Sequence, residues 1–287
     1  MGHPPLGKTG SRLTELSQRW AKQGTTYLDG ASQQALNVPV KKTLHALAVD
    51  IGCGTGQVSR SLAPHFEKII GVDISEAQLD EARKETNLSN VKYIKCHAED
   101  LPADDGSVDL ITAAHAAHWF DKERFLKEVN RVLKPGGCVA LFGFTTGIEF
   151  SFPGVNPGRL TDIYEEEFEH MLPYRSKLLF VNDSMLQELF EAIDYPEKER
   201  IENLRVKRPI SVSGAVGLIE SFSVYQCFLR AEPVAAKATL KRMHQRVHME
   251  ELDDDGHVDF WPLIHQWRGI TVVVAQITKN RKKNKRK

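Results

Sequence analysis

The sequence has few of the features that mark a metal site, a disulfide framework, a membrane protein or a nucleic-acid binder. Its four cysteines are scattered, with no CxxC pair and no Cys/His set at metal-ligand spacing. No apolar run approaches the roughly 18 residues of a membrane span, and the first residues contain no apolar signal region. The 38 basic residues balance 38 acidic ones. We therefore expect a soluble cytoplasmic protein with no metal, no membrane association and no nucleic-acid partner.

What is present, from Leu44 to Phe144, is an alternation of short apolar segments with amphipathic ones. This rhythm is typical of βα units on a parallel sheet. It predicts strands at residues 45–51, 68–74, 91–96, 108–114 and 138–144. Ser75 and Gln78 have the spacing of a capping box for a helix after the second strand. Asp121 is placed to cap another helix after the fourth strand.

Beyond Thr145 the pattern loosens, and the elements are predicted one by one. Helices are expected at residues 160–172, 185–193, 218–230 and 235–249. A strand is expected at residues 204–212, and GITVVVAQIT at residues 269–278 reads as a strong buried strand. Phe222 and Tyr225 are three positions apart on one predicted helix, which favours core packing over a substrate clamp.

The stretch VDIGCGTGQVSR, residues 49–60, carries the clearest chemical signal. Glycines at alternate positions after a strand let the backbone approach a ligand closely. The loop is not the dinucleotide fingerprint G-x-G-x-x-G, because Gln57 stands where the third glycine belongs. Asp50 would repel a pyrophosphate but suits an ammonium group, and Asp73 follows the second strand where a carboxylate can hold a ribose. A ligand with a ribose and an amino acid, such as S-adenosylmethionine, fits both.

The segments DIGCGTG, VDIS, HAEDLP, SVDLITAAHAAHWFD and RVLKPGG stand in the order and spacing of one family. They resemble class I S-adenosylmethionine-dependent methyltransferases of the type 11 superfamily. HAAHWFD followed by FLKEVNRVLKPGG looks most like the branch that includes trans-aconitate methyltransferase. The resemblance implies a Rossmann-like, mostly parallel seven-stranded α/β sheet with helices on both faces and a reversed last strand. It also implies S-adenosylmethionine as the cofactor and S-adenosylhomocysteine as its product.

The resemblance assigns expected roles to residues of the cofactor site. Asp50 with Gly52, Gly54 and Gly56 would hold the methionine part, and Asp73, followed by Ile74, would hold the ribose. The remaining residues implied to line the site are Ala98 and Glu99 beside the adenine, and Ala114 and His115 at the end of the fourth strand. The chain departs from the family in having His97 where an acidic residue is frequent. An Arg-Pro-x-Tyr-Pro-like segment is not visible before Lys41.

The family also suggests an organisation for the whole chain. Residues 1–40 are expected to form a helical segment or lid, and residues 41–146 the Rossmann-like cofactor-binding core. Residues 147–278 are expected to form a helical substrate-side insertion and the strands that complete the sheet. Residues 279–287, KNRKKNKRK, read as a disordered basic tail, although such a tail can also touch RNA or act as a nuclear signal.

The methyl acceptor is the least determined part of the prediction. A small-molecule carboxylic acid is the leading class, because an ionised carboxylate needs no general base. A phenol, amine or thiol would benefit from one, and His118 or His115 would then be the candidate. Alternatively, His118 caps a helix and Trp119 packs beneath it. Arg159 and Arg175 could pair with a substrate carboxylate.

Two further functions stay open. The Asn/Asp-Pro-Pro-aromatic motif of enzymes that methylate nucleobase or amide nitrogens is replaced here by AAHAAHWF, which argues against that substrate class. A methyltransferase acting on RNA or protein through the basic tail is one alternative. A non-catalytic regulator that binds S-adenosylmethionine is the other, because residues that bind a cofactor do not prove turnover.

Overall fold

The computed structural model describes residues 45–144, 148–152, 155–156, 158–175, 182–250 and 263–277. The chain divides into two compact units. Unit 1 comprises Met1–Gly143, Asn182–Glu202 and Thr271–Lys287, and unit 2 comprises Phe144–Val181 and Asn203–Ile270. The predicted segment at residues 1–40 and the tail at residues 279–287 lie outside the described residues.

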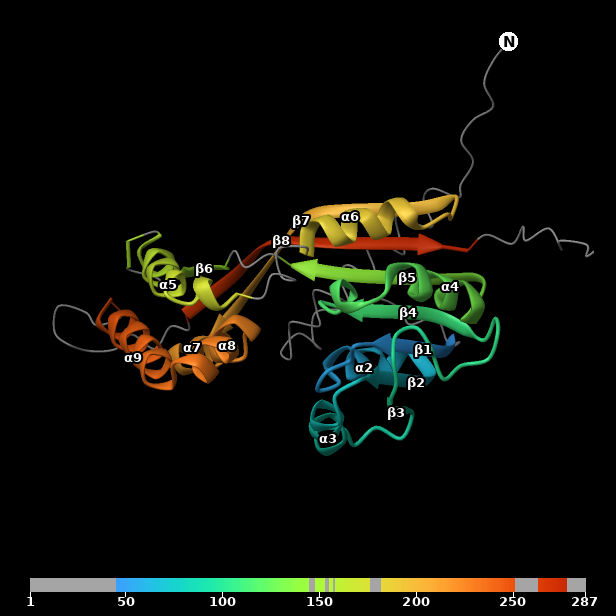
Figure 1. Cartoon of the computed structure of the whole chain (residues 1–287), viewed down its shortest axis with the longest axis horizontal. Helices are drawn as coiled ribbons and strands as arrows, with labels where there is room; N and C mark the ends of the chain where they lie inside the picture. The colour runs from blue at the N-terminus through green and yellow to red at the C-terminus, as the bar shows by residue number, and fades with distance from the viewer. Residues whose placement is uncertain are drawn as a thin grey trace, which may run out of the picture. The chain divides into compact units, whose positions relative to one another are not determined.

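The described strands form one sheet in the order β3-β2-β1-β4-β5-β8-β6, with β7 also paired to β8. Pairing is parallel from β3 through β5. The arrow of β8 runs opposite to those of β4 and β5 (Figure 1). The predicted Rossmann-like sheet with a reversed last strand is thereby confirmed, and the short β6 is added to it. The bounds are β1 His45–Ile51, β2 Phe66–Asp73, β3 Val91–Lys95, β4 Val108–Ala114, β5 Leu133–Phe144, β6 Ile148–Ser151, β7 Glu197–Ile210 and β8 Leu263–Gln276.

Helices cover both faces of the sheet in unit 1, because successive strand residues point to opposite sides. Val49 and Ile51 of β1 join a buried cluster with Phe125 of α4 and Leu189 of α6. On the other face, Asp50 lies beneath α2, where Ser59 contacts it. The helical elements of unit 1 are α2 Gln57–Leu62, η1 Ala63–His65, α3 Glu76–Lys84, η2 Ala117–Trp119, α4 Lys122–Val132 and α6 Asn182–Ala192.

Two helix starts were predicted from capping residues, and both helices begin where expected, but the side-chain capping bond forms at only one of them. Asp121 caps α4 as expected, since its side chain accepts a hydrogen bond from the backbone N–H of Arg124 at 3.1 Å. Ser75 makes no side-chain cap for α3. Its backbone N–H instead donates to Asp73 Oδ1 at 2.8 Å. The start of α3 is therefore fixed by the carboxylate at the end of β2.

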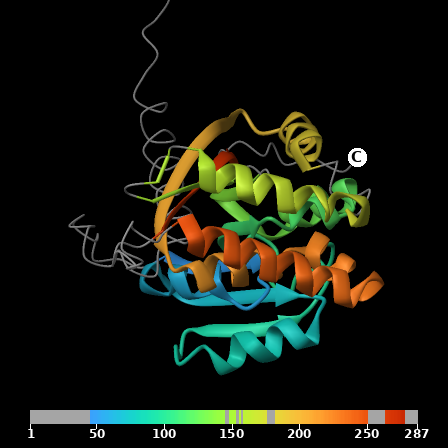
Figure 2. The same cartoon turned by 90° about the vertical axis from the view of Figure 1, so that its left-hand side faces the viewer.

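Unit 2 is a helical cluster in which α9 packs against α5, α7 and α8. Figure 2 shows α5 and α9 lying side by side. The single helix predicted at residues 218–230 is wrong. The chain breaks at Ser221, whose N–H closes the last turn of α7, and Phe222 is extended before α8 begins. The bounds are α5 Arg159–Glu169, η3 Leu172–Tyr174, α7 Val212–Glu220, α8 Ser223–Ala231 and α9 Pro233–Glu250.

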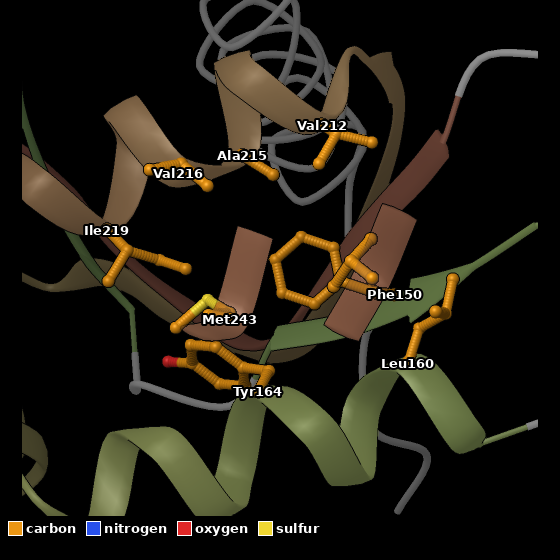
Figure 3. Close-up of a pocket in the computed structure, with 9 residues that line it drawn as sticks. Phe150, Leu160, Tyr164, Val212, Ala215, Val216, Ile219 and Met243 are labelled. Carbon is orange, nitrogen blue, oxygen red and sulfur yellow. The ribbon is translucent and has the colours of Figure 1, made fainter. Parts of the chain in front are cut away.

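Unit 2 encloses an apolar gap between β6, α5, α7 and α9 (Figure 3). Eight of its nine lining side chains have no hydrogen-bonding group apart from the soft sulfur of Met243, and the ninth is Tyr164. The predicted core role of Tyr225 in α8 is confirmed by its 1% exposure. We interpret the gap as part of the hydrophobic core of unit 2, because it lacks the convergent polar groups of a ligand site.

Among the described helices, none is by itself long and apolar enough to cross a bilayer. The bent pair α7 and α8 reaches the required length and composition only when the two helices are combined across a 73° break.

Candidate active site

The glycine loop after β1 turns through three left-handed residues. Gly52, Gly54 and Gly56 have φ angles of 64°, 54° and 79°. L-residues with a side chain rarely adopt this conformation, so the backbone path itself requires glycine at these positions. The loop is held to the end of β2, because Cys53 N–H donates to Val72 O at 3.0 Å.

The three glycines differ in what surrounds them. A Cβ on Gly52 would lie 2.4 Å from Ala116 Cβ, and one on Gly56 would lie 2.1 Å from Tyr93 Oη. A Cβ on Gly54 would meet only Gln78 Oε1, at 3.9 Å. Gly52 and Gly56 are therefore required by protein packing, whereas Gly54 leaves space for a ligand to approach the backbone.

Asp73 connects the loop to β2 and keeps capacity for a ligand. Its Oδ2 accepts from Gly54 N–H at 2.9 Å, and its Oδ1 accepts from Ser75 N–H at 2.8 Å. Each carboxylate oxygen has a second lone pair, so the half-buried side chain can still accept two hydroxyl hydrogen bonds. Ile74, next in the chain, is 62% exposed. These features fit the expected ribose and adenine contacts, which stay predictions.

Asp50 lies deeper than the sequence suggested. Its side chain is fully buried, and its two carboxylate oxygens accept hydrogen bonds from Ser59 Oγ at 2.7 Å and Thr112 Oγ1 at 2.8 Å. Burial raises the pKa of this carboxyl from 3.8 to about 6, against the opposing effect of the two hydroxyl bonds. Asp50 therefore ties α2 to the sheet beneath the loop, and its expected attraction for the ligand ammonium stays a prediction.

The partners of Asp50 were missed in the sequence. Ser59 lies on the buried side of α2, and Thr112 is a polar residue inside the apolar strand VDLITAA. A polar side chain at an inward position of a strand usually has a buried hydrogen-bond partner. That signal was available for Thr112.

The loop after β3 carries the residues expected beside the adenine. Ala98 is buried in the core of unit 1, and Glu99 Oε1 accepts from the backbone N–H of Asp121 at 2.8 Å. The structure thus connects this loop to the segment that follows β4. His97, the position that departs from the family pattern, is exposed.

The segment after β4 brings two histidines to the same edge of the sheet. Ala114 ends β4 and His115 follows it, with Ala116 lying against Gly52 of the glycine loop. His118 lies in η2 and is 6% exposed. The ring centroids of His115 and His118 are 5.1 Å apart.

Both imidazoles have a lowered pKa in this environment. Burial, with a smaller effect from His118, lowers the pKa of His115 from 6.5 to about 4. Burial also lowers the pKa of His118. Both rings are therefore neutral at pH 7, and a neutral imidazole such as that of His118 has one nitrogen of the accepting kind.

Trp119 lies beside this pair, and its position contradicts the alternative in which it packs beneath a helix capped by His118. Its ring centroid is 4.9 Å from that of His118, and the residue is 54% exposed. It does not pack beneath a helix capped by His118. The described part of the chain thus has an accessible aromatic face next to a neutral imidazole.

The structure brings most of the predicted site residues of unit 1 to one edge of the sheet. Loops at the carboxyl ends of adjacent parallel strands meet there, as in other open α/β sheets. Arg159 and Arg175, at the start of α5 and after η3, belong to unit 2, and their contact with a substrate stays a prediction. No group of three or more potential metal ligands occurs within the described ranges.

Comparison with known proteins gives the family context of this site. A family model described as a methyltransferase domain matches residues 49–141. A methyltransferase of Dictyostelium discoideum is 29% identical over 191 residues, which cover 64% of this chain and 67% of the relative. The demethylmenaquinone methyltransferase of Staphylococcus carnosus is 32% identical over 179 residues, which cover 57% of this chain and 72% of that protein.

The chain is also similar to a C-methyltransferase in sequence and to a solved methyltransferase structure in fold. A ubiquinone/menaquinone biosynthesis C-methyltransferase of Idiomarina loihiensis is 32% identical over 166 residues, or 54% of this chain and 62% of its own length. A solved structure from Anaeromyxobacter dehalogenans, assigned as a type II methyltransferase, has a TM-score of 0.61 and 24% identity. It covers 82% of this chain and 92% of its own, and at that identity it supports the fold alone.

Proposed function

Because the chain belongs to the class I S-adenosylmethionine-dependent methyltransferases, we propose that it methylates a small molecule whose reacting group must first lose a proton. The acceptor class we favour is a planar ring with an ionisable hydroxyl. The observation that carries this proposal is the buried, neutral His118 beside the exposed ring of Trp119.

The residues of unit 1 fit the cofactor of this family. Gly54 offers open space at the loop, Asp73 keeps two lone pairs for hydroxyl groups, and Ile74 presents an exposed apolar side chain. When bound, S-adenosylmethionine supplies a methyl group on a positively charged sulfur, which is strongly electrophilic. The chain itself has to orient the acceptor, exclude water and remove the acceptor's proton.

His118 is suited to act as the general base that removes that proton. A neutral imidazole accepts the proton of a ring hydroxyl, which leaves the oxygen anionic and makes the neighbouring ring carbon nucleophilic. Either the oxygen or that carbon could then accept the methyl group as its bond to sulfur breaks, and after transfer to carbon the hydrogen on that carbon would leave as a proton to restore the ring. The relatives named as demethylmenaquinone methyltransferase and as C-methyltransferases favour carbon.

A carboxylic acid is the second candidate, supported by the likeness of HAAHWFD and FLKEVNRVLKPGG to the trans-aconitate methyltransferase branch. An ionised carboxylate needs no base, and His118 could only donate a hydrogen bond to it. The lowered pKa of His118 weakens this candidate, because a neutral imidazole is a poorer anchor for an anion than an imidazolium. We also propose that the protein is cytoplasmic and that its partner is a small-molecule acceptor.

The experiment that separates the two candidates offers labelled S-adenosylmethionine with two probes, 1,4-naphthohydroquinone and trans-aconitate. Products are identified by mass, and treatment with mild alkali cleaves a methyl ester but not a carbon-bound methyl group. We expect an alkali-stable product from the naphthohydroquinone. Labelling of trans-aconitate alone would favour the carboxylate candidate.

The variant His118→Ala tests the role of the base directly. With a hydroxyl-bearing ring, kcat/KM should fall on the order of a hundredfold or more, and the acidic limb of the pH profile should disappear. With a carboxylate the loss should be about tenfold, without a change in pH dependence. An unchanged kcat/KM would remove His118 from the mechanism.

A further inference from the structure

His115 has an unusual backbone for its residue type. Its φ angle is 52°, and among the described residues it is the only non-glycine with a positive φ. This left-handed conformation is costly for a residue with a Cβ, and glycine would adopt it freely. The backbone is held there because His115 N–H donates to Phe142 O of β5 at 2.8 Å. A side chain kept at a strained position next to a candidate site suggests a use for that side chain.

The reversal at His115 determines where the following residues lie. It ends β4, places Ala116 against the glycine loop and leads directly into η2, which contains His118. The imidazole of His115 meets that of His118 at an interplanar angle of 60°, in an edge-to-face arrangement. The ring of Trp119 contacts His118 at an interplanar angle of 44°.

We propose that His115 is a positioning residue for His118, with its strained backbone directing an imidazole edge onto the His118 ring so that this ring keeps one orientation at the carboxyl edge of the sheet. The proposal rests on the proposed function of His118 as the base. His115 would act through His118 and need not touch the acceptor.

Among the described residues, several charged groups on and around the elements that pack against η2 have hydrogen-bond or ionic partners. On α6, which packs against η2, Glu188 pairs with Lys122 at 3.1 Å and Glu191 accepts from Gln187. Glu99 accepts from the backbone at Asp121. Burial is the only cause that lowers the pKa of His118. Removing the neighbouring ring of His115 should therefore act on His118 mainly by admitting water.

The test compares His115→Gly with His115→Ala in the full-length protein carrying ring-labelled histidine. The His118 resonance is assigned by its loss in His118→Ala, and its titration is followed by NMR. In His115→Gly we expect the His118 midpoint to rise by about half a pH unit or more toward the ordinary histidine value, because the ring is better hydrated. His97→Ala, at an exposed loop position, is the matched control and should leave the midpoint unchanged.

Thermal unfolding supplies the second readout. If the backbone at position 115 is strained, His115→Gly should melt at a higher temperature than His115→Ala, since alanine keeps the strain and glycine relieves it. On whichever probe acceptor the enzyme turns over, His115→Gly should lower kcat about tenfold while the KM for that acceptor changes less than twofold, because His115 need not touch the acceptor.

Two outcomes would overturn the proposal. An unchanged His118 midpoint in His115→Gly would show that the ring of His115 does not shape the environment of His118. Equal melting temperatures of the glycine and alanine variants would remove the strain argument. Neither outcome depends on the acceptor. Failure of the proposed function would instead show as a His118→Ala variant with normal kcat/KM.

Discussion

At the scale of single residues, the alternate glycines divide into two kinds that the spacing G-x-G-x-G does not distinguish. All three have a left-handed φ angle. Only at Gly54 is the space where a Cβ would lie free of nearby protein atoms. A glycine that is also required by protein packing and a glycine that makes room for a ligand should respond differently to the same substitution.

We therefore predict that Gly54→Ala folds but binds S-adenosylmethionine at least about thirtyfold more weakly, because its Cβ would occupy ligand space. Its stability should fall by only about 1 kcal/mol, the cost of a left-handed alanine. Gly52→Ala and Gly56→Ala are the matched controls. They carry the same backbone strain and additional collisions, which cost about 1–3 kcal/mol more. Chemical unfolding and titration calorimetry measure both effects, and normal cofactor affinity in folded Gly54→Ala would contradict the placement of the ligand.

Asp50 makes stability depend on pH in a direction opposite to that of a salt-bridged carboxylate. Its folded pKa, about 6, is higher than the 3.8 of an ordinary aspartate. The folded state therefore binds the proton more tightly than the unfolded state. The stability from this group is fully present below pH 3.8 and is lost as the pH rises through 6.

Asp50→Asn removes this dependence. Between pH 5 and 7.5 the wild-type protein should lose about 1 kcal/mol of unfolding free energy through Asp50, and the variant should not. Urea unfolding at the two pH values gives the comparison. An identical pH dependence in both proteins would show that Asp50 keeps an ordinary pKa. If its charge also attracts the ligand ammonium, the variant should bind S-adenosylmethionine more weakly at pH 7.5.

At the scale of elements, the last turn of α4 holds the loop after β3. Arg131 donates to the backbone carbonyls of Leu101 and Ala103 and pairs with Glu128 and Asp105. Glu128 in turn accepts from Leu101 N–H at 2.8 Å. These contacts fix the loop that carries the residues expected beside the adenine.

We predict that Arg131→Met lowers the unfolding free energy by about 1–2 kcal/mol, because partly buried carbonyls lose their donor while the apolar stem is kept. Cofactor affinity should fall several-fold as the loop loosens. Arg83→Met is a suitable control, since Arg83 pairs with the exposed Glu76 and Asp80 of α3, and such exposed pairs contribute little. Equal effects of the two substitutions in urea unfolding and calorimetry would rule out a special role for Arg131.

At the scale of the whole molecule, the neutral net charge hides an uneven distribution along the chain. Seven of the nine residues from Lys279 to Lys287 are basic. We predict that deleting these nine residues leaves turnover of a small-molecule acceptor unchanged, because a basic tail adds nothing to the recognition of a neutral ring. Steady-state kinetics at several salt concentrations test this. A loss of activity that low salt restores would favour an anionic polymer as the acceptor.

The sequence by itself determined the parallel sheet, the glycine loop and the position of Asp73, whereas the reversal of the last strand was expected only from the family resemblance. The first three features depend on local spacing: alternation of apolar residues, glycines at a strand end, and a carboxylate after the next strand. Asp121 as the cap of α4 was predictable for the same reason. Each signal lies within a few residues, so no knowledge of the folded chain was needed.

Only the tertiary structure decided what these residues face. Tyr93 lies 37 positions from Gly56, yet its ring fills the space where a Cβ of residue 56 would lie. Thr112 lies 62 positions from Asp50, yet its hydroxyl donates to the Asp50 carboxylate. The strain at His115 depends on its bond to β5, and the break between α7 and α8 interrupts a run whose apolar pattern is continuous. The contacts of Gly56, Asp50 and His115 join segments that are far apart in the sequence, and the spacing of residues along the chain does not encode them, because such contacts exist only in the folded chain.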